Sequence, residues 1–250
     1  MLRADGLTDK GRIRSTNEDR FAVDEALGLC VVADGMGGHK AGEIAAHLAV
    51  DAVVGFVREP EQTGWSFGLD PALSEAGNRI RTAIHLAHLQ ILEEAGTTDE
   101  YAGMGTTIVA ALVIDGRVAV GHVGDSRLYR LTAGRLRQLT DDDSWMASML
   151  AHDPHADPVA LLDHPLRNAL TNVVGARSRT DVHVVEEQLA DGDLLLLTTD
   201  GVHGVLDEER LELLLVENGD PASLAASIVQ TAIARGSHDN CTAVVARYKK

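Results

Sequence analysis

The sequence predicts an α+β fold in which mainly antiparallel sheets are covered by helices. Short apolar runs rich in Val, Ile and Leu recur along the 250 residues and are typical of strands. Two of the turns between these runs consist of residues that favour tight hairpins, which join antiparallel neighbours. Helical patterns come in blocks between the strands and do not alternate with them as regular parallel βαβ units would.

Strands are expected where an apolar run is bounded by turn residues. Asp115-Gly116 separates two such runs and Ala133-Gly134 follows another, and both pairs predict tight hairpins. In chain order, the expected strands are residues 21–23, 27–33, 106–114, 118–123, 128–131, 182–186, 194–199 and 242–248.

Two long helices are expected where small or aliphatic residues recur with the helical period and so share one face. These are residues 41–57, whose repeating residue is Ala, and residues 71–95, whose repeating residues are Leu, Ile and Ala. Shorter helices are expected at residues 144–151, 208–216 and 221–234.

Composition indicates an ordinary globular protein, with 45% hydrophobic and 24% charged residues. Neither a Pro- or Ser-rich linker nor an internal repeat divides the chain, so we expect one domain over residues 1–250. Every apolar run is far shorter than the roughly 20 residues of a membrane-spanning helix. The N-terminal residues lack the apolar stretch of a secretory signal. We therefore expect a cytoplasmic protein without a membrane partner, and we expect Cys30 and Cys241 to be buried free thiols.

The net charge limits the choice of partners. Lys and Arg number 22 against 38 Asp and Glu, which gives −16. This charge repels a polyanion, so nucleic acid is a poor candidate partner. An acidic protein that acts on phosphate esters must first reverse the local field, and bound divalent cations do this most directly.

Four aspartates lie beside the ends of expected strands: Asp34, Asp125, Asp200 and Asp239. A single Asp-Gly is most simply a turn, but four such residues at strand ends predict a shared site. Carboxylates that cluster raise one another's pKa values unless cations neutralise them. Oxygen ligands favour Mg²⁺ or Mn²⁺ over Zn²⁺, which prefers nitrogen and sulfur.

Seven motifs in order resemble the metal-dependent PPM-type protein phosphatases, the type 2C class of Ser/Thr phosphatases, in their bacterial single-domain form. They cover nearly the whole chain, and an ordered set is far more specific than any one of them. The motifs are RSTNED at residues 14–19, VVADGMGGH at 31–39, AGMGTT at 102–107, GHVGDSRLYR at 121–130, HPLRNALTNVVG at 164–175, LLTTDGV at 196–202 and SHDN at 237–240.

The resemblance implies a four-layer α-β-β-α sandwich, with two mainly antiparallel sheets flanked by helix pairs. It also implies hydrolysis of phosphoserine and phosphothreonine on proteins, opposing a cytosolic Ser/Thr kinase. We accordingly expect phosphoproteins and a kinase as partners and expect the protein to be a monomer.

The resemblance further implies two Mn²⁺ or Mg²⁺ ions, bridged by Asp34. The backbone carbonyl of Gly35 would bind one ion, and Asp200 and Asp239 would bind the other. Glu18 and Asp19 would hold waters of these ions. Two cations a few ångströms apart lower the pKa of a shared water, which then attacks phosphorus in line.

Two further roles follow from the same resemblance. Arg14 would bind two phosphate oxygens with its planar fork, a geometry that lysine cannot copy. Asp125 would share a third, weaker metal site with Asp200, helped by Asn168. Residues 140–172 correspond to the family's flap, where substrates would be selected.

Some assignments stay open at this stage. Animal members carry a histidine where Met36 stands, so the proton donor is either His39 or a water. Residues 141–143, all Asp, are expected to form a solvated helix start. A catalytically silent phosphoprotein-binding module is the alternative to an enzyme, although loss of a metal aspartate would have signalled it. A dimetal hydrolase acting on nucleic acid is disfavoured by the negative charge.

Overall fold

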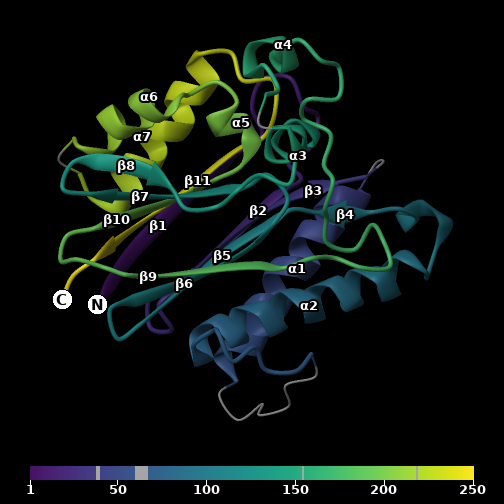
Figure 1. The fold of residues 1–250 in the computed structure, drawn as a ribbon, viewed down its shortest axis with the longest axis horizontal. Coiled ribbons are helices and arrows are strands. Elements are labelled where there is room, and N and C mark those ends of the chain that lie inside the picture. Colours follow the sequence, from purple (N-terminus) through teal and green to yellow (C-terminus); the bar gives the residue numbers. More distant parts are fainter. Residues whose placement is uncertain (38–39, 60–66, 154, 218) are drawn as a thin grey trace.

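In the computed structural model, two antiparallel β-sheets stack face to face and helices cover the outer face of each (Figure 1). The structure describes residues 1–37, 40–59, 67–153, 155–217 and 219–250. The predicted α+β class and its four-layer α-β-β-α arrangement are confirmed.

The two sheets draw strands from distant parts of the chain, and every pairing is antiparallel. The first sheet has the order β1 (Leu2–Asp9), β11 (Cys241–Tyr248), β10 (Leu194–Thr198), β7 (Arg127–Thr132) and β8 (Arg135–Gln138). The second has the order β2 (Asp19–Asp24), β3 (Leu29–Met36), β5 (Ile108–Ile114), β6 (Arg117–Val123) and β9 (His183–Gln188), with the short β4 (Gly105–Thr106) beside β3.

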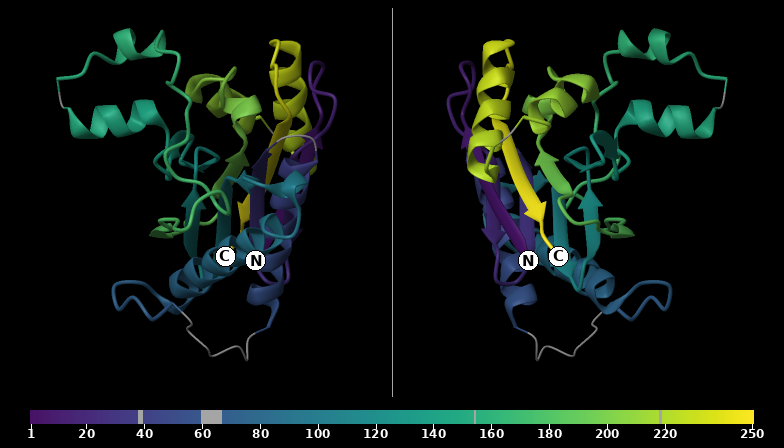
Figure 2. Two further views of the ribbon diagram at one scale, coloured as in Figure 1. Left: turned by 90° about the vertical axis from the view of Figure 1, so that its right-hand side faces the viewer. Right: turned by 90° about the vertical axis from the view of Figure 1, so that its left-hand side faces the viewer.

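The helices form the outer layers and one projection. The second sheet is covered by α1 (Ala41–Arg58) and α2 (Glu75–Ala95), which the 3₁₀ turn η1 (Asp99–Tyr101) follows. The first is covered by α5 (Asp200–His203), α6 (Glu208–Leu215) and α7 (Pro221–Ala234). Between β8 and β9, α3 (Trp145–His152) and α4 (Pro158–Leu162) extend away from the sandwich, as the teal segment of Figure 2 shows.

Apolar side chains fill three layers, and the strands alternate between them. In β3, Val31 packs toward α1 and α2, whereas Val32 packs between the sheets. In β10, Leu196 packs toward α7 and Leu197 between the sheets. Because both faces of these strands are buried, their sequences are continuous apolar runs.

Both expected hairpins are confirmed by the backbone. Asp115 and Gly116 have φ values of 50° and 78°, and Ala133 and Gly134 have 48° and 78°. Two successive residues with positive φ are the signature of the type I′ turn, whose twist matches that of the flanking strands. The first turn joins β5 to β6 and the second joins β7 to β8.

Several elements differ from the expectation. The strands β1 and β8 and the short helices α4 and α5 were not predicted, because they are short or polar and their partners are distant in sequence. The second long helix begins at Glu75 and not at residue 71, since the Ser74 hydroxyl accepts the Gly77 N–H and caps it.

Cys30 and Cys241 are free and buried, as expected. Across the described residues, no helix is both long and apolar enough to cross a membrane.

Gly121 and Gly55 give a matched test of the packing between α2 and the second sheet. A Cβ at Gly121 of β6 would collide with Ile80 and lie 2.8 Å from Cδ1 of Ile84, both on α2. A Cβ at exposed Gly55 of α1 would meet nothing within 4 Å. We expect Gly121→Ala to lower the free energy of unfolding by about 1–3 kcal/mol through overpacking. Gly55→Ala should raise it by about 0.5–1 kcal/mol through helix propensity. Urea unfolding measures both, and equal effects would contradict this packing.

Candidate active site

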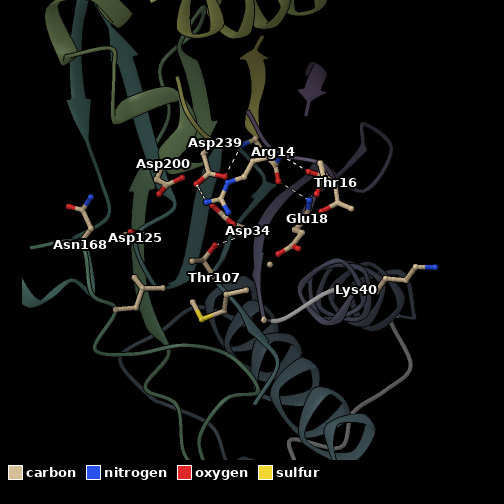
Figure 3. A pocket seen from close by; sticks show the side chains of 16 residues that line it. Arg14, Thr16, Glu18, Asp34, Lys40, Thr107, Asp125, Asn168, Asp200 and Asp239 are labelled. Atoms are coloured by element: carbon tan, nitrogen blue, oxygen red, sulfur yellow. Dashed lines mark hydrogen bonds and ion pairs between the residues drawn. The ribbon is translucent and has the colours of Figure 1, made fainter. Parts of the chain in front are cut away.

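A cleft of about 660 Å³ lies where segments from both sheets end. All but one of the residues expected at the site line it, together with Asn168 (Figure 3). The lining members of that set are Arg14, Glu18, Asp34, Gly35, Asp125, Asp200 and Asp239. Asp19 is the exception.

Asp34 lies at the floor of the cleft. The sequence predicted that Asp34 follows the end of its strand. Strand β3 instead continues through Met36, so Asp34 lies within the strand. Its backbone N–H donates to Oγ1 of Thr107 at 3.0 Å, and its carbonyl accepts the Thr107 N–H at 2.9 Å. Burial raises the pKa of the Asp34 carboxyl well above its ordinary value, and the neighbouring Asp19 and Asp200 raise it further.

Asp19 is buried behind Asp34, its register partner on the adjacent strand. Its Oδ2 accepts the hydroxyls of Thr199 at 2.8 Å and Thr242 at 2.6 Å, while Oδ1 has no partner. Burial raises the pKa of Asp19 to about 7, against the opposing effect of these two hydrogen bonds. Asp19 therefore supports the floor of the cleft and does not face its opening.

Asp200 and Asp239 approach from the first sheet. Asp200 begins α5, separated from the end of β10 by one residue, and its buried Oδ1 has no hydrogen-bond partner. Burial and the nearby Asp239 raise the pKa of Asp200. Asp239 accepts Nη2 of Arg14 at 2.6 Å through its Oδ2 (Figure 3). This ion pair holds the arginine side chain inside the ring of carboxylates.

Asn240 positions the N-terminal loop that carries Arg14 and Glu18. Its Oδ1 accepts the Glu18 N–H at 2.8 Å, and its side-chain amide donates to the carbonyls of Lys10 and Thr16 at 2.9 Å each. Only the aspartate of the SHDN motif was expected at the site, and this role of Asn240 was not predicted. The position directly after a metal-type aspartate was the available signal.

Asp125 is held from the flap side. It follows Gly124, whose φ of 95° favours glycine. The Gly124 N–H donates to Oδ2 of Asp143 at 2.9 Å, and Oδ1 of Asp143 lies 3.0 Å from Nε2 of His183. Burial and the charge of Asp200 raise the pKa of Asp125 to about 7. A residue at the base of the flap thus fixes the loop that carries Asp125.

The expectation of a solvated Asp run at residues 141–143 is wrong for two of its members. Asp142 accepts Nε and Nη2 of Arg127 at 2.8 and 2.7 Å, because β7 presents this arginine directly beneath the run. Asp143 is engaged as described above. Only Asp141 is exposed, and α3 begins later, at Trp145.

The described residues around position 39 offer no side chain that is placed to donate a proton in the cleft. Met36 lines the cleft but has no acidic proton. His39 lies outside the described residues. Lys40 belongs to the lining, yet its side chain points away from the carboxylates (Figure 3).

The donor set suits a hard divalent cation, although the side chains are turned to protein partners. Within the described ranges, no three His, Cys, Asp or Glu side chains are grouped so that they already could hold a metal ion. Asp239 is paired with Arg14, and Oδ2 of Asp19 accepts hydrogen bonds from two threonine hydroxyls. The partnerless buried oxygen of Asp200 and the raised pKa values nevertheless show a site that lacks positive charge. All its donors are oxygens, which fits Mn²⁺ or Mg²⁺.

Comparisons with known proteins show the family to which the chain belongs. The protein phosphatase 2C family model matches residues 12–231. The serine/threonine phosphatase stp of Listeria welshimeri is 32% identical over 247 residues, which are 98% of this chain and 95% of that protein. The crystal structure of the Mycobacterium tuberculosis phosphatase PstP/Ppp superposes with a TM-score of 0.87 at 27% identity, covering 100% and 99% of the two chains. A structure of the PstP catalytic domain in complex with two manganese ions gives a TM-score of 0.83 at 27% identity, with the same coverage.

Asp125 should make the stability of the metal-free protein depend on pH. Its pKa is about 7 in the folded protein against an ordinary 3.8, so the folded state keeps a proton that the unfolded chain has lost between these values. The stabilisation is complete below about pH 4 and is lost as pH rises through about 7. Relative to Asp125→Asn in EDTA, the wild-type free energy of unfolding should therefore fall by about 1–3 kcal/mol from pH 4.5 to 8. Urea unfolding at several pH values tests this, and parallel curves would contradict it.

Proposed function

Because the chain belongs to the protein phosphatase 2C family and is a serine/threonine protein phosphatase, we propose that it hydrolyses phosphoserine and phosphothreonine on proteins with two Mn²⁺ or Mg²⁺ ions. One observation carries the proposal. Carboxylates from four separate segments face a single cleft beside an arginine, namely Asp34, Asp125, Asp200 and Asp239. A cleft of this charge binds a phosphate ester only when cations reverse its field.

The resemblance to the family assigns the metal ligands. Asp34 would hold both ions, with the Gly35 carbonyl on one and Asp200 and Asp239 on the other, and all four residues line the cleft. Glu18 lines the cleft and Asp19 is buried behind Asp34, and the resemblance to the family assigns both to waters of these ions. When bound, the two cations would lower the pKa of a water that attacks phosphorus. Asp125 would add a third site with Asp200, and Asn168, which lies beside Asp125 in Figure 3, would assist it.

Arg14 would pair with Asp239 before the substrate binds and with the substrate phosphate afterwards. Its guanidinium is pre-oriented among the carboxylates by the ion pair with Asp239. A phosphate ester offers two oxygens that can accept two parallel N–H bonds from the guanidinium group. This contact is stronger than the single contact with Oδ2 of Asp239. Transfer of Arg14 to the phosphate would release Asp239 for a metal ion. Substrate binding and metal binding would then favour each other.

The wider setting is part of the same proposal. The enzyme would oppose a Ser/Thr kinase in the cytoplasm, where buried free thiols such as Cys30 and Cys241 stay reduced. Its charge of −16 disfavours self-association and supports a monomer. The three apolar layers share strands with one another, which supports one catalytic domain over residues 1–250.

The metal requirement gives the first test. Phosphate release from a phosphothreonine peptide should rise with Mn²⁺ and vanish in EDTA. Asp200→Asn should lower the rate by about 10²-fold or more at any Mn²⁺ concentration, since metal ions supply several kcal/mol of charge stabilisation. Silence of the wild type despite measurable Mn²⁺ binding would instead favour the phosphoprotein-binding module.

The phosphate fork gives the second test. Arg14→Lys keeps the charge but loses bidentate geometry, so KM for the phosphopeptide should rise by about tenfold, the equivalent of one charged hydrogen bond. Arg3→Lys is the matched control, because Arg3 lies on the surface and pairs with Glu25. A KM that is unchanged in Arg14→Lys would remove Arg14 from the phosphate site.

A further inference from the structure

A second depression, of about 830 Å³, lies between α3 and the loop that follows β8. We call it the flap groove. One wall is the inner face of α3, with Met146 and Leu150, and the other is formed by the loop residues Asp141, Asp142 and Asp143. Apart from Asp143, which holds the loop of Asp125, the groove residues have no role in the proposed chemistry of the cleft.

The α3 wall is an apolar helix face without a covering layer in the described structure. Met146 and Leu150 lie four residues apart, and Ala147 and Ala151 extend the same face. None of the eight residues of α3 is buried. A face of this kind, next to a groove, is suited to receive apolar side chains from another molecule.

The helix is nonetheless held in place. The Ser144 hydroxyl accepts the Ala147 N–H and caps its N-terminus. The Trp145 N–H donates to the Ala169 carbonyl at 2.8 Å, and the Trp145 ring stacks on His164 with 4.1 Å between centroids. The groove is therefore a formed surface with one anchored wall.

The opposite wall is negatively charged. Residues 140–172 contain six Asp against a single Arg. Asp142 is neutralised by Arg127 and Asp143 pairs with His183, but exposed Asp141 makes no hydrogen bond or ion pair with any described residue. The free charge on the rim of an apolar groove favours an occupant that combines cationic with apolar side chains.

The groove also adjoins the catalytic cleft. Leu170 lines the cleft and the next residue, Thr171, lines the groove. The same segment is fixed to the groove wall, because the Thr171 N–H donates to the Asp143 carbonyl at 2.8 Å and Leu170 pairs with Ser144. An extended peptide with its phosphorylated residue in the cleft would cross residues 170–171 to reach the groove.

We propose that the flap groove binds a segment of the phosphoprotein substrate that contains Lys or Arg together with large apolar residues, on one side of the phosphorylated residue. This inference rests on the proposed function. A nucleic acid is repelled by the acidic rim, and a second copy would bring another charge of −16 against it. The substrate chain is the favoured occupant, because a phosphorylated residue bound in the cleft brings its neighbouring residues close to the groove.

The test compares two phosphothreonine peptides of equal length, made with the variable segment on either side. One carries Lys, Arg and Leu in that segment, and the other carries Glu and Ser. We expect the wild type to show a KM about tenfold lower for the basic and apolar peptide, with the same kcat. This factor corresponds to about one charge pair or one partly buried apolar side chain.

Variants locate the preference. Leu150→Ser and Asp141→Asn should each reduce it to about two- to threefold, because each removes one of the two kinds of contact. Val159→Ser and Asp163→Asn are matched controls on the flap outside the groove, since Val159 is 71% exposed, and they should keep the full preference. Turnover of para-nitrophenyl phosphate, which is too small to span both sites, should be unchanged in all four variants.

The outcomes separate the groove from the catalytic proposal. Equal KM values for the two peptides, or a preference that survives in Leu150→Ser and Asp141→Asn, would overturn the groove proposal. A wild type that sediments as a dimer and becomes a monomer in Leu150→Ser would overturn it too, because the occupant would be a second copy. If no substrate is hydrolysed, the proposed function fails. Fluorescence anisotropy with labelled peptides on wild type and Leu150→Ser then decides the groove independently.

Discussion

Repulsion between buried carboxylates is the constraint on which this site depends. Burial and mutual charge raise the pKa values of Asp34 and Asp200, and the whole chain adds a background of −16. Arg14 offsets part of this charge through its ion pair with Asp239, but that pair lies half-exposed to water and is weak. Protonation of the carboxylates would also reduce this repulsion, and so would bound divalent cations. Only cations leave the carboxylates ionised and the field favourable to a phosphate.

The frame that holds these groups together against their repulsion consists of hydrogen bonds between the sheets that are formed by neutral Thr and Asn side chains. Asp19 belongs to the second sheet, yet it accepts hydroxyls from Thr199 and Thr242, which follow or belong to strands of the first. Asn240 likewise ties β11 to the loop before β2 through three hydrogen bonds. The carboxylates are thus fixed from behind by polar groups that do not themselves repel, while three apolar layers supply the stability.

Local patterns in the sequence predicted the parts of this structure that local physics determines. The two type I′ hairpins follow from residues such as Asp115-Gly116, and the helical period marks α1 and α2. The edge strand β1 was missed because its polar sequence forms a strand only beside β11, some 230 residues away. The identity of the cleft residues came from ordered motifs, whereas the burial of Asp19 and the partners of Asp142 depend on tertiary contacts that no local pattern encodes.

Asp143 connects the proposed selection of substrate to the proposed chemistry. Asp143 lines the flap groove, and its Oδ2 accepts the N–H of Gly124, the residue before Asp125. Asn172 donates to the same oxygen at 2.8 Å, and His183 lies against the other oxygen. An occupant of the groove would therefore lie one hydrogen bond from the loop of a proposed metal ligand. Because Asp143 is held by Gly124, Asn172 and His183 at once, this wall is fixed, which agrees with a groove that changes KM and leaves kcat unchanged.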